Sequence, residues 1–296
     1  MLSVLIPTYN YDVTTLVNSL HAQLLQSQIN FEILILDDGS NHVINTTNQV
    51  LNTLAFVTFK TNVKNVGLSN NRNLLAEASI YNYILFIDGD SLVISDQYIA
   101  NYLSNITPET AIIYGGRIHP KQVSKKRELR LVYGKKREDL SAKQRSEKPH
   151  KRMFCNNTLM TKATFNAITF EKTLNQYGHE DTLFAYKASV LKTAILHIDN
   201  PILHGDVDFN NVFLNKTEKG LQNLDYIYKS ELIPQNFIPF LEYFSKLKRF
   251  KLNYLLAYSY YFTNPITKYL LTNKLTSLAL FDIFRISYFC HINLKK

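Results

Sequence analysis

The chain contains 296 residues, of which 46% are hydrophobic, and it carries a formal net charge of +9 at neutral pH. This hydrophobic content argues against a disordered chain and is sufficient for a substantial core. The positive charge favours an anionic partner, but charge alone does not choose between nucleic acid, a membrane surface and a phosphorylated small molecule. Two cysteines, Cys155 and Cys290, form neither a metal-binding nor a disulfide pattern and indicate a reducing compartment.

The first part of the chain alternates apolar runs with helical patterns. Residues 2–6 form an apolar run with no basic segment before it, so we expect a first strand rather than a signal peptide. Further apolar runs predict strands, and apolar residues three or four positions apart predict helices. The later strands are predicted at 31–36, 55–60 and 83–87, and the helices at 12–27 and 68–78. This alternation predicts an α/β fold in which helices flank both faces of a mostly parallel, twisted sheet.

The second part of the chain has a different composition. Residues 121–152 contain 13 Lys or Arg against 4 Asp or Glu, and we expect a basic, mobile excursion from the domain. After it we expect a strand at 153–160, a helix from residue 180 and a strand at 194–198. Beyond His204 the pattern is helical, and residues 235–296 hold 9 basic residues, 2 acidic residues and 15 of the 37 aromatic residues. No run reaches the roughly 18 to 20 apolar residues that cross a bilayer. We therefore expect a cytoplasmic protein that at most lies on the inner face of a membrane.

Two acidic motifs follow predicted strands. Asp88-Gly89-Asp90 comes directly after the strand 83–87, and residues 37–40 (Asp-Asp-Gly-Ser) follow the strand 31–36. Carboxylates one residue apart are suitable ligands for a hard divalent cation that also binds diphosphate oxygens and water. Each motif alone is equally well explained as a turn, because Asp and Gly favour turns. Their joint occurrence favours a ligand site, because carboxylates on one edge of a parallel sheet repel each other without a cation or ligand.

Three further segments have both structural and functional interpretations. Residues 65–73, which include Arg72, predict a loop entering a helix, where backbone amides attract anions; an ordinary helix cap with a solvated arginine is the simpler explanation. Glu180 and Asp181 begin a predicted helix, either as ordinary first-turn acids or with one carboxylate as a general base. His204 by itself is more readily a structural histidine. The sequence has neither a Gly-x-x-x-x-Gly-Lys loop nor a Gly-x-Gly-x-x-Gly fingerprint, which argues against P-loop and dinucleotide-binding proteins.

In combination, these segments resemble the family-2 inverting glycosyltransferases of GT-A fold. The resemblance begins at residues 3–10 (Ser-Val-Leu-Ile-Pro-Thr-Tyr-Asn), which are similar to the opening strand and nucleotide-binding loop of that family. It continues through residues 37–40, 67–73, 88–90 and 180–181 and ends at His204, in the family's order and approximate spacing. It implies a GT-A glycosyltransferase domain at 1–215, followed by a helical, basic and aromatic-rich C-terminal segment at 216–296.

The resemblance also implies roles for individual residues. The base of the donor nucleotide would be bound by Pro7, Tyr9, Asp38 and Arg72, and its ribose or the metal by Asp88. Mn²⁺ or Mg²⁺ would be held against the diphosphate by Asp90, His204 and Asp88. Asp181 would be the catalytic base, and Glu180 would help to position the acceptor.

The implied reaction transfers a sugar from a nucleotide-diphosphate donor to a hydroxyl acceptor, with inversion at the anomeric carbon. A UDP-sugar is the expected donor by family habit, with GDP- and dTDP-sugars as alternatives. The expected acceptor is a surface glycan or a lipid-linked saccharide. The chain contains no Trp and so lacks the Gln-x-x-Arg-Trp signature of processive polysaccharide synthases. We therefore expect single addition, and the sequence leaves the sugar, the nucleotide and the acceptor open.

Other functions remain to be weighed against this one. A non-catalytic nucleotide-sugar binding protein is disfavoured, because binding alone requires neither Asp181 nor His204. A nucleotidyltransferase normally needs a glycine-rich phosphate loop near the N-terminus, which residues 7–10 are not. Basic and aromatic residues at 246–261 are able to stack nucleic-acid bases. The helical spacing of Phe and Leu there instead favours packing or contact with an anionic membrane, and we expect no nucleic-acid partner.

Overall fold

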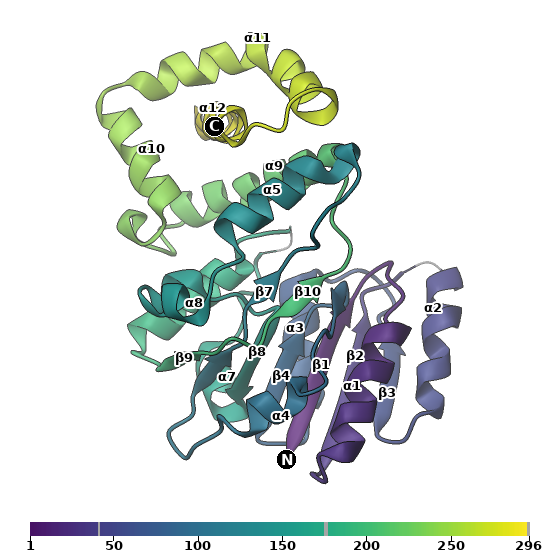
Figure 1. Cartoon of the computed structure of the whole chain (residues 1–296). Coiled ribbons are helices and arrows are strands. Elements are labelled where there is room, and N and C mark those ends of the chain that lie inside the picture. The colour runs from purple at the N-terminus through teal and green to yellow at the C-terminus, as the bar shows by residue number, and fades with distance from the viewer. Residues whose placement is uncertain (41, 175–176, 295–296) are drawn as a thin grey trace. The chain divides into compact units, whose positions relative to one another are not determined.

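The computed structural model describes residues 1–40, 42–174 and 177–294 (Figure 1). The chain forms two compact units. Unit 1 consists of Met1–Ile118, Asp139–Asn175 and Glu180–Asp206, and unit 2 consists of His119–Glu138, Gln176–His179 and Val207–Lys296. The division into domains at residue 215 stays a prediction, because compactness does not define which segments fold independently.

Unit 1 is built on a seven-stranded sheet with the order β3-β2-β1-β4-β8-β6-β9. Its strands are β1 (Leu2–Thr8), β2 (Phe31–Asp37), β3 (Val57–Thr61), β4 (Tyr83–Ile87), β6 (Ile112–Tyr114), β8 (Asn157–Thr161) and β9 (Ile195–His197). The first four strands are parallel, and β8 runs antiparallel to both β4 and β6. The prediction of an α/β fold with a mostly parallel sheet is therefore confirmed.

Helices cover both faces of this sheet (Figure 1). The helices of unit 1 are α1 (Thr14–Gln26), α2 (His42–Gln49), α3 (Leu68–Ala78), α4 (Tyr98–Leu103), α6 (Ala142–Ser146), α7 (Lys162–Ile168) and α8 (Glu180–Val190). One core joins Val4 and Ile6 of β1 to apolar residues of α1 and α4. The other core joins Leu5 of the same strand to residues of α3, α7 and α8. Alternate residues of β1 thus face opposite cores, which is why this strand is apolar throughout.

A small second sheet in unit 1 has the order β5-β10-β7. Its strands are β5 (Ser91–Leu92), β7 (Arg117–Ile118) and β10 (Ile202–His204). The antiparallel pairing of β10 with β5 places His204 opposite Ser91. This sheet therefore brings a residue from the end of the predicted catalytic domain next to the 88–90 motif.

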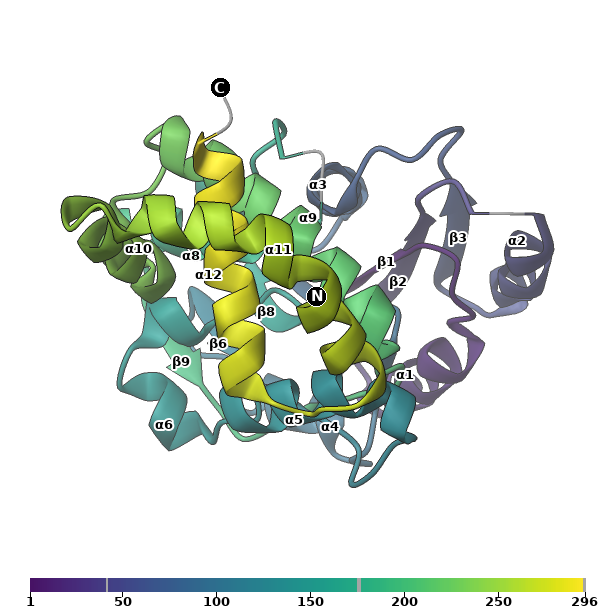
Figure 2. The same ribbon diagram turned by 90° about the horizontal axis from the view of Figure 1, so that it is seen from above.

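Unit 2 is helical, with α5 (Glu128–Arg137), α9 (Asn210–Lys229), α10 (Pro239–Arg249), α11 (Leu252–Asn273) and α12 (Leu278–Leu294). The predicted C-terminal helical region is therefore present. Seen from above, α11 crosses over α12, which lies beneath it (Figure 2). Among the described residues, none of the helices combines the length and the apolar character needed to cross a membrane.

The basic stretch 121–152, expected to be a mobile excursion, is largely helical and contributes to both units. It contains α5 and α6, and its Leu129 and Leu131 are buried. Arg145 is also buried, and its guanidinium donates to the carbonyl oxygens of Gly115 (3.2 Å) and Ile198 (2.7 Å). The low apolar content suggested mobility, but an arginine with five donors satisfies buried backbone carbonyls and orders the segment.

Asn157 at the start of β8 holds this part of the sheet together. Its Oδ1 accepts hydrogen bonds from the hydroxyls of Tyr98 (2.5 Å) and Tyr102 (2.6 Å). Its Nδ2 donates to the carbonyl oxygens of Gly116 (2.7 Å) and Asn200 (2.9 Å). All four bonds are buried, so the amide satisfies four groups from three different segments: α4, the turn at Gly116 and the segment at Asn200.

We predict that Asn157→Ala lowers the free energy of unfolding by about 3 kcal/mol or more, because two buried tyrosine hydroxyls and two carbonyls each lose one hydrogen bond. Urea denaturation followed by circular dichroism measures the change. Asn18→Ala, at an exposed position of α1, is the control and should change stability by less than about 0.5 kcal/mol. Equal effects of the two substitutions would contradict the role of Asn157.

Candidate active site

Three of the predicted nucleotide-binding residues, Pro7, Tyr9 and Asp38, lie where β1 and β2 end. Pro7 and Thr8 pair with Leu36 and Asp37 at the carboxyl ends of these parallel strands. Tyr9 follows β1 and is 54% exposed. In α/β sheets, ligands usually bind at the carboxyl ends of the strands. The exposed ring of Tyr9 lies at such an end and is available to contact a ligand.

Asp38 follows β2 and fixes the loop that leads into α3. Its carboxylate accepts hydrogen bonds from the backbone amides of Val66 (2.8 Å) and Gly67 (2.9 Å) and from the side-chain amide of Asn62 (3.1 Å). Gly67 adopts a φ of 85°, which favours glycine. Asp38 is therefore a clamp for residues 62–67, and its predicted contact with a nucleotide base stays a prediction.

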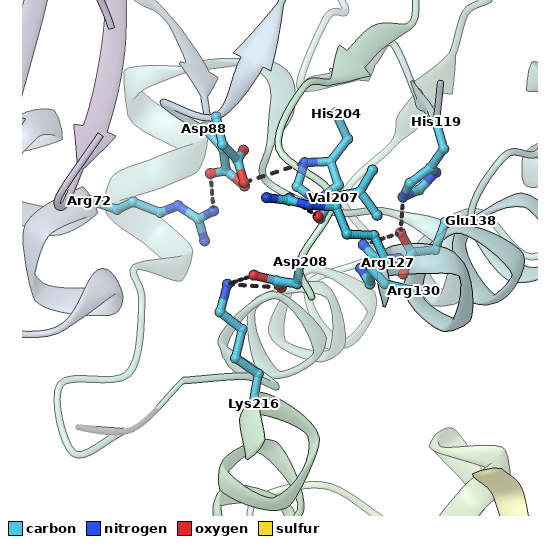
Figure 3. Close-up of polar contacts among 11 residues, drawn as sticks. Arg72, Asp88, His119, Arg127, Arg130, Glu138, His204, Val207, Asp208 and Lys216 are labelled. Carbon is cyan, nitrogen blue, oxygen red and sulfur yellow. Dashed lines mark hydrogen bonds and ion pairs between the residues drawn. The ribbon is translucent and has the colours of Figure 1, made fainter. Parts of the chain in front are cut away.

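Arg72 of α3 is the centre of the site. Its side chain is 1% exposed, and its guanidinium donates to Asp88 Oδ1 (2.7 Å) after β4 and to Asp181 Oδ1 (2.7 Å) at the start of α8. Figure 3 shows Arg72 reaching towards Asp88. The guanidinium carbon lies 5.1 Å from the centre of the Phe170 ring. One buried cation thus joins Asp88 and Asp181, two predicted site residues from different motifs that lie 93 positions apart in the sequence.

Glu180 lies beside this cluster, with Oε1 3.8 Å from Arg72 Nη1. Burial, reinforced by the charge of Asp181, raises the pKa of Glu180 to about 7. Its neighbour Asp181 makes the closer ion pair with Arg72. The two adjacent carboxyl groups therefore differ in environment, as they do in sites where one carboxylate is an acid and the other a base.

Cys155 completes the surroundings of Asp181. It is fully buried and within hydrogen-bonding reach of the Asp181 side chain. Burial raises the pKa of the Cys155 thiol, with a further contribution from Asp181, so the thiol stays protonated. A protonated thiol is a weak donor to the carboxylate. The sequence contained no signal for this contact, because Cys155 lies outside every motif.

The predicted metal ligands Asp90 and His204 face each other. His204 Nδ1 lies 3.3 Å from Asp90 Oδ2, and the Gly205 amide donates to the Asp90 carbonyl (2.9 Å). Asp88, the third predicted ligand, has one oxygen bound by Arg72. Across residues 1–40, 42–174 and 177–294, no three His, Cys, Asp or Glu side chains gather as a metal site. A carboxylate with an adjacent imidazole fits a divalent cation that takes its other ligands from diphosphate and water.

The sequence matches the profile of glycosyl transferase family 2 over residues 3–178. The chain belongs to glycosyl transferase family 2. Two curated relatives are uncharacterised glycosyltransferases of Rickettsia felis, 35% identical over 95 residues, and Rickettsia conorii, 34% identical over 96 residues. Each match covers 32% of this family-2 chain, and it covers 15% and 16% of those relatives.

Solved structures of glycosyltransferases share the fold of this family-2 protein. Residues 1–349 of S. aureus TarS in complex with UDP align over 99% of this chain and 90% of that one, with a TM-score of 0.56 and 17% identity. The mannosyltransferase PcManGT of Pyrobaculum calidifontis, in complex with GDP-Man and Mn²⁺, aligns over 100% of this chain and 88% of that one, with a TM-score of 0.57 and 12% identity. These alignments confirm the predicted GT-A fold.

We predict that Arg72→Gln lowers the free energy of unfolding by about 3–5 kcal/mol, because it leaves Asp88 and Asp181 without their buried counter-charge. Arg152→Gln is the matched control, because Arg152 pairs with Glu147 on the surface (3.3 Å). The control should lose less than about 1 kcal/mol. Urea denaturation measures both, and a loss below about 1 kcal/mol for Arg72→Gln would contradict the proposed ion-pair bridge.

Glu180 makes stability depend on pH in a defined direction. Its pKa is about 7 in the folded chain and 4.5 ordinarily, so the unfolded chain releases this proton at lower pH than the folded chain does. Ionisation of Glu180 therefore costs folding free energy as pH rises from about 4.5 to about 7, by at most about 3 kcal/mol. Glu180→Gln removes that cost. The unfolding free energy of the variant, relative to that of wild type, should therefore increase as pH is raised from about 5 to about 8.

Urea denaturation of wild type and Glu180→Gln across this pH range tests the prediction. Glu109→Gln, which neutralises an exposed carboxylate, is the control. A stability difference for Glu180→Gln that does not change with pH, or that changes as it does for Glu109→Gln, would be inconsistent with a raised pKa.

Proposed function

We propose that the chain is an inverting glycosyltransferase that moves a sugar from a UDP-sugar to a hydroxyl acceptor, with Asp181 as the general base. The observation that supports this most directly is that the guanidinium of Arg72 donates hydrogen bonds to both Asp181 and Asp88. The proposed base is thereby held at a fixed place beside the proposed donor site. Family membership supports the reaction class, since residues 3–178 match glycosyl transferase family 2. Single addition is part of the proposal.

The chemistry follows from the two unlike carboxyl groups. The acceptor hydroxyl gives its proton to Asp181, its oxygen forms the bond to the anomeric carbon, and the bond to the diphosphate breaks on the opposite face. Arg72 fixes the direction of the base, and protonated Glu180 is able to donate a hydrogen bond that orients the acceptor.

Asp90 and His204, together with the free side of Asp88, would hold Mn²⁺ or Mg²⁺ against the donor diphosphate. When bound, the cation neutralises the charge that develops on the departing diphosphate. The pairing of β10 with β5 supports this assignment, because it brings His204 to the 88–90 motif. PcManGT, which shares the fold, was solved with GDP-Man and Mn²⁺.

The donor site would be formed by Pro7, Tyr9, Asp38 and Asp88, with Arg72 acting through Asp88. Exposed Tyr9 offers a ring to the base, and buried Asp38 keeps the loop 62–67 in place. TarS was solved with UDP and with UDP-GlcNAc, and we favour a UDP-sugar over GDP- and dTDP-sugars for this chain. The acceptor is proposed to be a surface glycan or lipid-linked saccharide, and the location to be cytoplasmic.

We predict that Asp90→Ala abolishes Mn²⁺-dependent release of nucleotide from the donor, because the metal loses the proposed carboxylate ligand that is not already paired with Arg72. Asp181→Asn should retain donor affinity and lose transfer by about 100-fold or more, because the base is removed and the nucleotide contacts are kept. A panel of nucleotide sugars with Mn²⁺ and a saccharide acceptor provides the measurement, with donor binding followed by calorimetry.

Asp96→Asn, an exposed position, is the control and should behave as wild type. Donor binding without transfer in wild type, unchanged by Asp181→Asn, would instead identify a nucleotide-sugar binding protein. Unchanged metal dependence in Asp90→Ala would overturn the metal assignment.

A further inference from the structure

Helix α11 has an apolar face that is exposed. Its exposed aromatic and aliphatic residues include Phe262 (81%), Tyr258 (68%) and Leu255 (67%). The full set on this face is Tyr254, Leu255, Tyr258, Tyr261, Phe262, Ile266 and Tyr269. At about 100° per residue these seven positions fall within an arc of about 140°. They therefore form one continuous stripe along the helix, which we call the outer face of α11.

The opposite side of α11 already packs within unit 2. Its buried residues are Asn253, Ala257, Tyr260, Thr267 and Leu271. Tyr260 stacks on His291 of α12 with ring centres 4.8 Å apart. In the view from above, α12 lies under α11 (Figure 2). The helix therefore has an inner face for the fold. On the outer face, Tyr261 also meets His291 edge-on, with ring centres 4.7 Å apart, and packing within unit 2 leaves the remaining side chains of that face exposed.

The stretch of chain that contains the outer face carries charge of a single sign, and one of its lysines, Lys268, pairs with Glu218 of α9 (2.7 Å). Residues 243–281 contain six Lys or Arg and no Asp or Glu. Lys248, Arg249 and Lys251 are exposed where α10 ends and α11 begins, and Lys274 is exposed where α11 ends. Cations thus lie at both ends of an exposed aromatic stripe. Anionic lipid attracts such cations at the level where Tyr, Phe and Leu enter the interface.

We propose that the outer face of α11 binds the surface of an anionic lipid bilayer. Tyr side chains suit this location because the ring is apolar and the hydroxyl remains in contact with water and headgroups. Among the described residues, no helix has the character of a membrane span, so α11 lies in the plane of the interface. This inference does not rest on the proposed transferase activity, although it would place the chain beside lipid-linked acceptors.

Sedimentation of the full-length chain with vesicles tests the proposal. The vesicles contain phosphatidylcholine alone or phosphatidylcholine with an equal amount of phosphatidylglycerol, and no donor sugar is present. We expect pelleting with the anionic vesicles at low salt and its reduction at high salt. Because no donor is needed, a failure here is distinguishable from a failure of glycosyl transfer.

Two variants separate the apolar and charged contributions. Leu255→Gln combined with Phe262→Gln should weaken binding to anionic vesicles at least about tenfold, since both apolar side chains leave the interface. Arg249→Gln, Lys251→Asn and Lys274→Gln together should weaken it on the order of 100-fold, at about fivefold for each basic residue near the surface. Asparagine is chosen at Lys251 because its φ is 61°, which asparagine tolerates.

Matched controls carry the same changes on unit 1. The apolar control, Val50→Gln with Ile80→Gln, removes two exposed apolar side chains. The charge control combines Lys60→Gln, Lys143→Gln and Lys192→Asn and removes three exposed charges. Asparagine is used at Lys192 because its φ is 53°. These controls should bind as wild type does. Circular dichroism melting of every variant shows that the fold is kept.

Four results would overturn the proposal. The first three are no pelleting of wild type with anionic vesicles, equal loss of binding in the α11 charge variant and its unit 1 control, and unchanged binding of the Leu255→Gln/Phe262→Gln variant. A fourth is self-association of wild type in analytical ultracentrifugation that this double variant abolishes while vesicle binding is absent. That result would assign the outer face of α11 to contact between two copies of the chain.

Discussion

The guanidinium of Arg72 is buried and is shared by carboxylates from two distant motifs. Removing this cation from water is costly, and two close ion pairs in a fixed geometry offset much of that cost. The consequence is mutual dependence: α3, the end of β4 and the start of α8 are held in one arrangement by a single side chain. The planar fork of arginine suits this role, because a lysine ammonium lacks two parallel sets of donors. The separation between the donor-side carboxylate and the proposed base is therefore set by the width of one guanidinium group.

The rest of unit 1 repeats this use of polar groups inside the protein. Asn157 satisfies two tyrosine hydroxyls and two carbonyls beside the sheet, and Arg145 satisfies carbonyls near β6 and β9. In unit 2, buried Arg130 pairs with Glu138 (3.0 Å). Some of the positive charge that the sequence carries is thus structural. Because some arginines are buried, an anionic partner contacts fewer positive charges than the net charge of +9 suggests. The cations near α11 are relevant to such a partner because they are exposed.

The sequence was most informative where a signal is local. Strand β4 was predicted at its observed bounds, and the α/β fold followed from alternating apolar runs and helical patterns. Strands β7 and β10 were not predicted, because they have only two and three residues and such short strands show no periodic pattern. The clustering of motifs at one sheet edge was expected, but the partners of Arg72 were not, since Asp181 is 109 positions away. Cys155 had no signal at all, because its importance comes only from its place beside Asp181. The helices within 121–152 were missed because buried arginines take the place of apolar residues there.

The two cysteines are distributed so that each unit contains one. Cys155 belongs to unit 1 and Cys290 to unit 2, and both are fully buried. A buried thiol reacts with an alkylating reagent only when its surroundings open, so its labelling rate reports how often that local structure opens. The chain therefore carries two intrinsic reporters, one beside the proposed base and one in α12. Mass spectrometry of separate peptides distinguishes them without any introduced label. Binding of a ligand beside Asp181 would slow labelling at Cys155, whereas a contact that orders α12 would be registered at Cys290.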